Sequence, residues 1–170
     1  HRLIRRQRQM CIRDRSSISI VSRLIPENIK FETSVCSTSY YIKGQVGALN
    51  QIILNLVTNA IHAIGDKKGR IKLQFGLSVD DDQTVRLVVE DNGCGMTTEQ
   101  TARVTDPFFT TRTTRKIGLG VPFFKMAAES TGGSFSIQSE PGVGTKVTAV
   151  FGLSHIDRMP LGDMNGTIYT

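Results

Sequence analysis

The stretch LNQIILNLVTNAIHAIG, from Leu49 to Gly65, carries the clearest structural signal in the sequence. Apolar residues recur in it at intervals of three and four, which predicts an amphipathic helix with one buried face. Asn55 and Asn59 are one turn apart, so their side chains lie on the same face and could meet a polar ligand together. Gly65 follows the last apolar residue of the pattern and is a typical helix end.

A second informative stretch, VRLVVEDNGCGM, runs from Val85 to Met96. Its alternating apolar residues predict a strand, and the strand leads directly into a turn with glycines at positions 93 and 95. Glycine lets the backbone turn sharply and lets another molecule approach it closely. An acidic residue at the exit of a strand, together with a helix that presents two amides, favours a nucleotide-binding pocket.

Two predicted hairpins supply most of the remaining structure. Residues 70–79 and 84–91 alternate apolar and polar side chains, so we expect them to pair as antiparallel strands with one buried face. The acidic triplet Asp80–Asp82 between them is most simply a solvated hairpin tip, not a metal site. Residues 134–139 and 146–153 form the second expected hairpin, around the turn sequence Pro-Gly-Val-Gly.

Other segments complete the expected fold. The sequences SISIVSRLI (17–25) and IKFETSV (29–35) have the composition of β-strands. Thr97 or Thr98 is suited to cap a short helix, and Gly120 opens a longer helix with a proline in its first turn. Helices mixed with hairpins predict an α+β fold, namely a two-layer α/β sandwich whose mixed, mostly antiparallel sheet is covered on one face by helices.

The composition is that of a globular protein with one buried core. The 170 residues are 39% hydrophobic and 21% charged. No apolar run approaches the roughly 20 residues of a membrane span, and no signal-peptide pattern opens the sequence. Three cysteines without metal-ligand spacing indicate reduced thiols, so we expect a cytoplasmic protein without a membrane segment.

The net charge of +6 is concentrated at the N-terminus. Residues 1–15 hold six arginines and one acid, a charge of +5, which leaves only +1 for the rest of the chain. This segment could be a basic arm for an acidic partner, but a disordered or non-native extension is the simpler interpretation. We therefore expect one domain over residues 16–153, an irregular tail over residues 154–170 and no nucleic-acid partner.

Five sequence motifs occur in an order that resembles one protein family. NLVTNA, DNGCGM, DPFFTTR, GLG and EPGVGT follow one another between Ile42 and Phe151. This series is similar to the ATP-binding domain of sensor histidine kinases, a domain type shared with gyrase, the Hsp90 chaperones and the MutL repair proteins. Each motif alone is a weak signal, but five in the family's order are a strong one. The resemblance implies a Bergerat-type ATP-binding fold with ATP and Mg²⁺ as ligands.

The resemblance assigns the two helix amides to the phosphate side of the pocket. Asn59 corresponds to the family's magnesium-binding asparagine, and its amide oxygen is a donor of the kind that Mg²⁺ prefers. Asn55, one turn earlier, would line the same wall of the catalytic site. From periodicity alone, both amides could instead lie on the solvated face of an amphipathic helix.

The glycine turn corresponds to the adenine-binding segment of the family. Asp91 is the implied acceptor for the adenine amino group, and Asn92 is expected beside it. Gly93 and Gly95 would let the backbone pass close to the base, and Met96 would offer an apolar surface to its ring. Without the resemblance, Asp91 could equally be a helix cap or a turn residue, and the role of Asn92 stays open.

The later motifs imply a mobile lid and further nucleotide contacts. Cations in the lid could reach phosphate oxygens, although a solvated basic loop would contain the same residues. Free backbone N–H groups at the start of the last helix could hold a phosphate. Thr145, near the adenine-binding acid, has a family counterpart, or is simply a strand residue. The cations of the lid are Arg112 and Lys116, and the residues that lead into the last helix are Gly118, Leu119 and Gly120.

The position four residues before Asn59 distinguishes the branches of the family. Members that hydrolyse ATP with a general base carry a glutamate there, whereas Asn55 has an amide that cannot accept a proton at neutral pH. The pattern is similar to that of histidine kinases, in which a partner's imidazole attacks the γ-phosphate. The three histidines, His1, His62 and His155, all lie outside the helical His-Glu setting in which the family carries its phosphoacceptor.

The resemblance therefore implies the catalytic module of a two-component sensor histidine kinase. Such a module binds Mg-ATP and transfers the γ-phosphate to a histidine on a dimerisation domain or on a separate phosphoacceptor protein, with a response regulator downstream. The alternative is a stand-alone ATP-binding regulatory module that switches conformation without phosphotransfer. The unusual lid, the missing phosphoacceptor and the extra tail after Ser154 favour this alternative. Lys116-Ile117 stands where the family lid usually has another glycine, and Val121-Pro122-Phe123 replaces an apolar-small-apolar sequence, and both departures bear on lid closure and turnover more than on nucleotide binding.

Overall fold

The structure of the chain, a computed structural model, describes residues 9–11, 15–35, 41–43, 48–79, 83–106 and 120–153. Its strands are β1 (Gln9–Cys11), β2 (Ile29–Val35), β3 (Tyr41–Lys43), β4 (Gly69–Leu77), β5 (Thr84–Asp91), β6 (Ser134–Glu140) and β7 (Gly144–Gly152). Its helices are α1 (Arg15–Ser22), α2 (Ala48–Ile64), α3 (Thr98–Arg103) and α4 (Gly120–Ser130).

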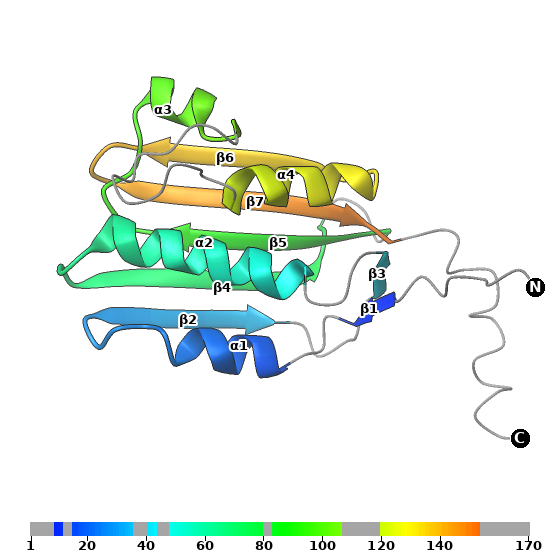
Figure 1. Cartoon of the computed structure of the whole chain (residues 1–170), viewed down its shortest axis with the longest axis horizontal. Coiled ribbons are helices and arrows are strands. Elements are labelled where there is room, and N and C mark those ends of the chain that lie inside the picture. The colour runs from blue at the N-terminus through cyan, green and yellow to red at the C-terminus, as the bar shows by residue number, and fades with distance from the viewer. Residues whose placement is uncertain are drawn as a thin grey trace, which may run out of the picture.

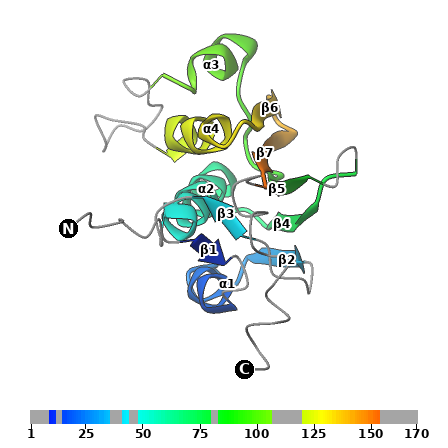
Figure 2. The same ribbon diagram turned by 90° about the vertical axis from the view of Figure 1, so that its right-hand side faces the viewer.

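Five strands form the main sheet, in the order β2-β4-β5-β7-β6. Strands β2 and β4 run parallel, and the other three neighbouring pairs are antiparallel. Helices α1, α2 and α4 lie side by side over one face of this sheet (Figure 1), and the view from the side shows the helices and strands as two layers (Figure 2). The expected two-layer sandwich and both expected hairpins are thus confirmed.

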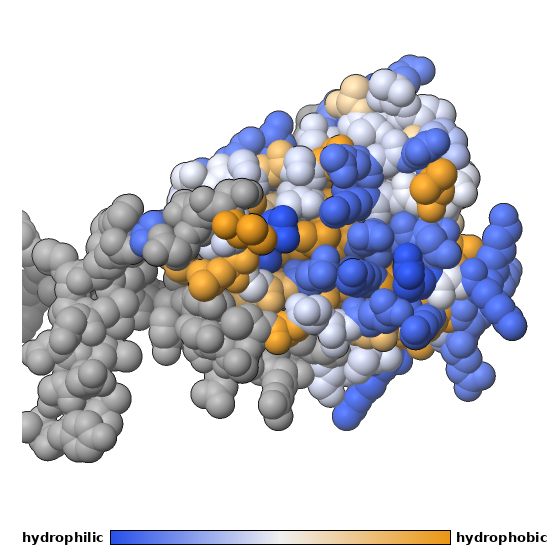
Figure 3. Space-filling view, turned by 180° about the vertical axis from the view of Figure 1, so that it is seen from behind, coloured by the Kyte–Doolittle hydropathy of each residue, from blue (hydrophilic) through white to orange (hydrophobic). Residues whose placement is uncertain are grey.

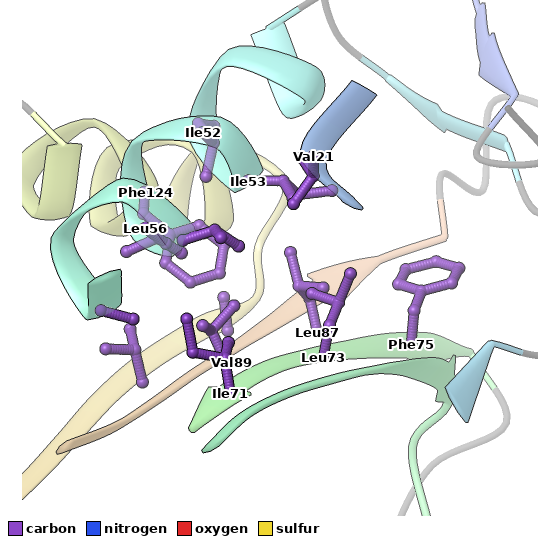
Figure 4. Close-up of a cluster of buried hydrophobic side chains, with 14 of the residues drawn as sticks. Val21, Ile52, Ile53, Leu56, Ile71, Leu73, Phe75, Leu87, Val89 and Phe124 are labelled. Carbon is purple, nitrogen blue, oxygen red and sulfur yellow. The ribbon is translucent and has the colours of Figure 1, made fainter. Parts of the chain in front are cut away.

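The core lies between α2, α4 and the covered face of the sheet. Figure 4 shows Ile52 and Leu56 of α2 pointing toward side chains of the central strands, such as Leu73. Phe124 of α4 is fully buried, with its ring edge-on to Phe135 at a centroid distance of 5.8 Å. The 3.6-residue period of the helix and the two-residue period of the strands place these apolar residues on facing surfaces. Hydrophobic burial therefore fixes α2 and α4 on the sheet.

No helix of the described ranges covers the opposite face of the sheet, where Figure 3 shows mainly polar side chains with some apolar ones between them. Strand register aligns five polar residues in one row across the sheet, and the first four members of this row alternate in charge. Its members are Glu32, Lys72, Glu90, Lys146 and Gln138. Opposite charges on neighbouring strands attract, so this pattern supports the observed register. Lys30, which bonds Glu32 at 2.8 Å, together with Arg70 and Lys72, lowers the pKa of the Glu32 carboxyl.

The segment expected to be the first strand is a helix, so that prediction was wrong. Residues 15–22 form α1, and the buried side chain of Val21 packs beside Ile53 of α2 (Figure 4). The Ser-Ile-Ser-Ile alternation is too short to separate a strand from a helix, and packing of the whole chain decides between them. Farther back, within residues 1–15, Gln9–Cys11 pair antiparallel with β3. The limits of the domain stay a prediction.

Local hydrogen bonds fix the start of α3 and the end of α2. Thr97 caps α3, where its side chain accepts from the backbone N–H of Gln100 and the Gln100 side chain bonds back to Thr97, as the sequence predicted. At the end of α2, the side-chain amide of Asn28 donates to the carbonyl oxygens of Gly65 at 3.1 Å and Lys67 at 2.7 Å. These bonds satisfy carbonyl groups that follow the helix and tie its end to β2.

Candidate functional site

The glycine turn after β5 packs directly against the last turn of α2. The backbone N–H of Cys94 donates to the carbonyl oxygen of Ala63 at 2.8 Å. A Cβ atom at Gly93 would lie 2.6 Å from the Cβ of Ala63, so only glycine allows this approach. The end of β5 and the end of α2 are therefore held together at one place.

The two predicted amides continue along α2 from that contact. Asn59 lies one turn before Ala63, and Asn55 one turn before Asn59, with about 6 Å of helix rise between successive members of this row. The side-chain oxygen of Asn55 accepts from Gln51 at 3.1 Å. A Cβ atom at Gly120 would lie 3.2 Å from the Cβ of Asn55 and 3.3 Å from Nδ2 of Asn59. The first residue of α4 thus lies against the amide face of α2.

Asp91 ends β5 on the helix-covered face of the sheet. Its carboxylate accepts hydrogen bonds from the backbone N–H groups of Gly93, at 2.8 Å, and of Thr145. Burial raises the pKa of this carboxyl, and the nearby charge of Glu90 adds to the rise, while the two hydrogen bonds act in the opposite direction. Two bonds leave further acceptor sites on the carboxylate, so Asp91 can still bind an N–H donor from a ligand.

Glycines bring the segments around Asp91 into close contact. Gly95 has φ of +66°, and a Cβ atom there would lie 1.9 Å from the carbonyl oxygen of Glu140. Gly144 has φ of +138°, and its Cβ would lie 2.0 Å from the carbonyl oxygen of Asp91. Gly142 then donates its N–H to the carbonyl oxygen of Cys94 at 2.8 Å. The glycine turn therefore lies directly on the turn between β6 and β7.

A hydroxyl pair joins these segments through side chains. Ser139 Oγ accepts from the backbone N–H of Met96 at 2.9 Å and lies 2.8 Å from Thr145 Oγ1. It is also 3.1 Å from the carbonyl oxygen of Gly144, to which it can donate. Register places Asp91 opposite Thr145 and Thr145 opposite Ser139, so the three polar side chains form a row at one end of an otherwise apolar sheet face.

Asn92, also predicted to contact the nucleotide, is engaged with its own sheet. Its side-chain oxygen accepts from the backbone N–H of Arg70 at 2.6 Å, and its own N–H donates to the carbonyl oxygen of Arg70 at 3.3 Å. These bonds extend the β4–β5 ladder one residue past Asp91. A contact between Asn92 and a nucleotide stays a prediction.

The structure brings together the predicted residues of α2, of the glycine turn, of β7 and of the start of α4. Four further predicted residues lie outside the described residues, as do Phe108 and Phe109 of the DPFFTTR motif. The four are Arg112, Lys116, Gly118 and Leu119.

Sequence reasoning missed Ala63 and Ser139. Ala63 lies outside the apolar pattern of the helix, in the same row as the two amides, and its contact with Gly93 depends on tertiary packing. Ser139 could have been found from the turn at residues 141–143, because pairing the flanking strands across it sets Ser139 opposite Thr145.

The side-chain oxygen atoms at the site are compatible with a magnesium ion that is held largely by a bound nucleotide. In the described part of the chain, no group of three or more His, Cys, Asp or Glu side chains could hold a metal ion alone. Mg²⁺ commonly takes one or two protein oxygens and fills its other positions with phosphate oxygens and water. A single amide oxygen from Asn59 fits this kind of coordination.

Comparison with known proteins agrees with this geometry. Residues 44–155 match the family described as histidine kinase-, DNA gyrase B-, and HSP90-like ATPase. The chain is 33% identical over 127 residues to the sensor histidine kinase ZraS of Klebsiella oxytoca, covering 75% of this chain and 26% of ZraS. It is 33% identical over 102 residues to the histidine-protein kinase AtoS of Escherichia coli, covering 60% of this chain and 16% of AtoS.

Solved structures show the same fold. The catalytic domain of the histidine kinase ThkA superposes with a TM-score of 0.68 at 24% identity, covering 86% of this chain and 96% of that one. The matched region spans 26% of the length of ZraS and 16% of that of AtoS, and 40% or less of the length of the other curated relatives compared. No helix in the described ranges is long and apolar enough to cross a membrane. The chain belongs to the histidine kinase-, gyrase- and HSP90-like ATPase family and has the ATP-binding catalytic domain of the histidine kinases.

Proposed function

We propose that this chain binds Mg-ATP and, as the catalytic module of a two-component sensor histidine kinase, transfers the γ-phosphate to a histidine. The observation that carries this proposal is the row of residues along α2. At one end of the row, Ala63 holds the turn that follows Asp91, and at the other end Asn55 and Asn59 meet Gly120. One rigid helix therefore links a carboxylate suited to a base with amides suited to phosphates and a metal.

The base would bind beside Asp91. Its carboxylate retains acceptor capacity after bonding Gly93 and Thr145, so it can accept from the amino group of adenine. Guanine lacks an amino donor at the equivalent position, and a buried acceptor left unpaired costs about 1–3 kcal/mol. Asp91 would therefore favour adenine nucleotides over guanine nucleotides.

The phosphates would lie along the amides of α2. Asn59 would hold Mg²⁺, which neutralises phosphate charge and orients the γ-phosphate for attack. Gly120 brings the N-terminus of α4 against the same amides, and the free N–H groups of a helix N-terminus favour an anion. With Asn55 in place of a basic glutamate, the site suits transfer to a nucleophile that is already basic, such as an imidazole, better than activation of water.

The phosphoacceptor would be a histidine of another domain or protein, and a response regulator would act downstream. His62 lies on α2, exposed, with its ring Nδ1 2.5 Å from the carbonyl oxygen of Thr58. A ring tied to its own helix is poorly placed to reach a phosphate bound on the amide face. Relatives named as sensor kinases, such as ZraS, support an acceptor domain outside the region matched here.

Two measurements test the proposal. Calorimetric titration of ATP and ADP, with and without Mg²⁺, compares the natural sequence with Asp91→Asn and with the matched control Asp66→Asn, in an exposed loop. We expect Asp91→Asn alone to weaken binding, about 10-fold or more. Failure of the natural sequence to bind either nucleotide at millimolar concentration would refute the proposed site.

Phosphotransfer is tested with γ-labelled ATP and an acceptor helical hairpin from a related sensor kinase. Label that is stable to base and labile to acid on the hairpin histidine is the expected result, and it should disappear with Asn59→Ala. Nucleotide binding without any transfer to several such hairpins would favour the regulatory alternative, in which the domain switches conformation without phosphotransfer.

A further inference from the structure

Asn28, in the turn between α1 and β2, holds the connection between α2 and β4 by three hydrogen bonds. Its side-chain nitrogen donates to the carbonyl oxygens of Gly65 at 3.1 Å and of Lys67 at 2.7 Å. Its backbone carbonyl oxygen accepts from the N–H of Gly69 at 3.0 Å. The opposite orientation of the side-chain amide would place its oxygen against two carbonyl oxygens. The two acceptors therefore fix the direction of the side-chain bonds.

The last turn of α2 is held on its other side by the glycine turn. The carbonyl oxygen of Ala63 accepts from the N–H of Cys94 at 2.8 Å, and Gly65, two residues after Ala63, bonds Asn28. The starts of β2 and β4 and the end of β5 lie at the same end of the sheet, because β4 pairs parallel with β2 and antiparallel with β5 (Figure 1). The end of α2 is therefore fixed between the turn before β2 and the turn after β5.

Loss of the Asn28 side chain would release one of these two anchors. The carbonyl groups that it bonds belong to an exposed connection, so water can take its place there without leaving a buried group unpaired. A helix end without its partners frays. Ala63 would then leave the glycine turn more often, and with it the N–H of Gly93, which bonds the Asp91 carboxylate at 2.8 Å, would be held less firmly.

We propose that Asn28 is a positioning residue for nucleotide binding: it fixes the end of α2 against which the glycine turn is placed. This inference rests on the proposed function. Apparent affinity falls in proportion to the fraction of molecules in the binding-competent arrangement, so a released helix end weakens binding without any lost contact to the ligand. Asn59 lies one turn farther from the helix end than Ala63, so the magnesium end of the site keeps its arrangement.

Calorimetric titration of ADP tests this role. For Asn28→Ala we expect ADP affinity to fall about fivefold or more, the equivalent of one hydrogen bond, with one ADP still bound per chain. Asn28→Asp has a similar size but no donor at neutral pH, and its carboxylate would face two carbonyl oxygens, so its affinity should fall at least as far. Glu27→Ala, an exposed neighbour in the same turn, is the matched control and should bind ADP normally.

Two further readouts separate positioning from a general loss of stability. The ratio of ATP affinities with and without Mg²⁺ should be the same in Asn28→Ala as in the natural sequence, because Asn59 keeps its place. Fewer ADP molecules bound per chain at unchanged affinity would mean that Asn28 only supports folding, and a changed magnesium ratio would mean that the whole helix moves. Either result would overturn this inference.

The two proposals fail in different ways. Normal ADP affinity in Asn28→Ala or in Asn28→Asp, with normal binding by the natural sequence, would overturn the positioning role and leave the proposed function standing. Absence of ADP binding by the natural sequence would overturn both.

Discussion

Gly120 and Asn59 are in near contact, although 61 positions separate them in the sequence: a Cβ atom at Gly120 would lie 3.3 Å from the side-chain nitrogen of Asn59. Gly120, the first residue of α4, therefore packs against the side chain of Asn59, which is proposed to hold magnesium. Any side chain at position 120 must displace either that amide or the start of α4.

Gly120→Ala tests this relationship. The added methyl group should push on Asn55 and Asn59, while replacing glycine by alanine favours folding by about 0.4–1 kcal/mol because it lowers the entropy of the unfolded chain. We therefore expect little change or a small gain in stability together with weaker Mg-ATP binding. Urea unfolding measures the first effect and calorimetry the second. An unchanged magnesium dependence of ATP binding would show that the amides have room to adjust.

Asp91→Asn should stabilise the nucleotide-free protein at neutral pH. Burial raises the pKa of Asp91, so the folded chain holds this proton more tightly than the unfolded chain does. The stabilisation from this group is complete below the unfolded pKa of about 3.9 and is lost as the pH rises through the folded pKa. Above that pH the ionised carboxylate is a cost that asparagine avoids, while its amide oxygen can still accept from Gly93.

The measurement for Asp91→Asn is the free energy of unfolding from urea titrations between pH 4 and pH 7. The advantage of the variant should be largest at neutral pH and shrink on acidification. Asp66→Asn, at an exposed position, is the matched control. A constant difference across this pH range would show that ionisation of Asp91 is not its cause.

Gly95→Ala should destabilise the fold much more than Gly142→Ala. Both glycines have positive φ, +66° and +77°, so alanine costs about 1–2 kcal/mol at either position. At Gly142 no atom lies within 4 Å of the added Cβ, whereas at Gly95 the carbonyl oxygen of Glu140 would lie at 1.9 Å. We expect about 1–2 kcal/mol at Gly142 and at least about 3 kcal/mol at Gly95. Equal losses in urea unfolding would mean that the glycine turn can move away from β6.

Phe124→Ala should remove a large part of the stability of the fold. The ring is fully buried and lies 5.8 Å and 6.0 Å from the ring centroids of Phe135 and Phe151. Truncation of such a residue costs about 3–5 kcal/mol. The adjacent Phe123 is 44% exposed, so Phe123→Ala should cost less than about 1 kcal/mol. Comparable losses in thermal unfolding would contradict the assignment of the buried face of α4.

Local patterns predicted most of the elements because long amphipathic segments have few alternatives. The period of α2, the alternation in β4 and β5, and the cap at Thr97 each depend on residues close together in sequence. The strand expected over residues 17–25 was a wrong prediction because four alternating residues fit a strand and a helix equally well. The helical state of residues 15–22 is decided by the burial of Val21 in the common core, a contact that no local pattern encodes.

For the candidate site too, part of the information lies in the sequence and part only in the tertiary structure. The sequence by itself determined which residues are candidates for the chemistry, since Asn55, Asn59, Asp91 and the glycines stand in recognisable motifs. Only the tertiary structure decided that Ala63 contacts the glycine turn, that Gly120 lies on the amides and that the hydroxyls of Ser139 and Thr145 lie 2.8 Å apart. Spacing along the chain fixes which face of a helix or strand a residue occupies, but the neighbour across that face is set by sheet order and packing, which depend on the whole chain at once.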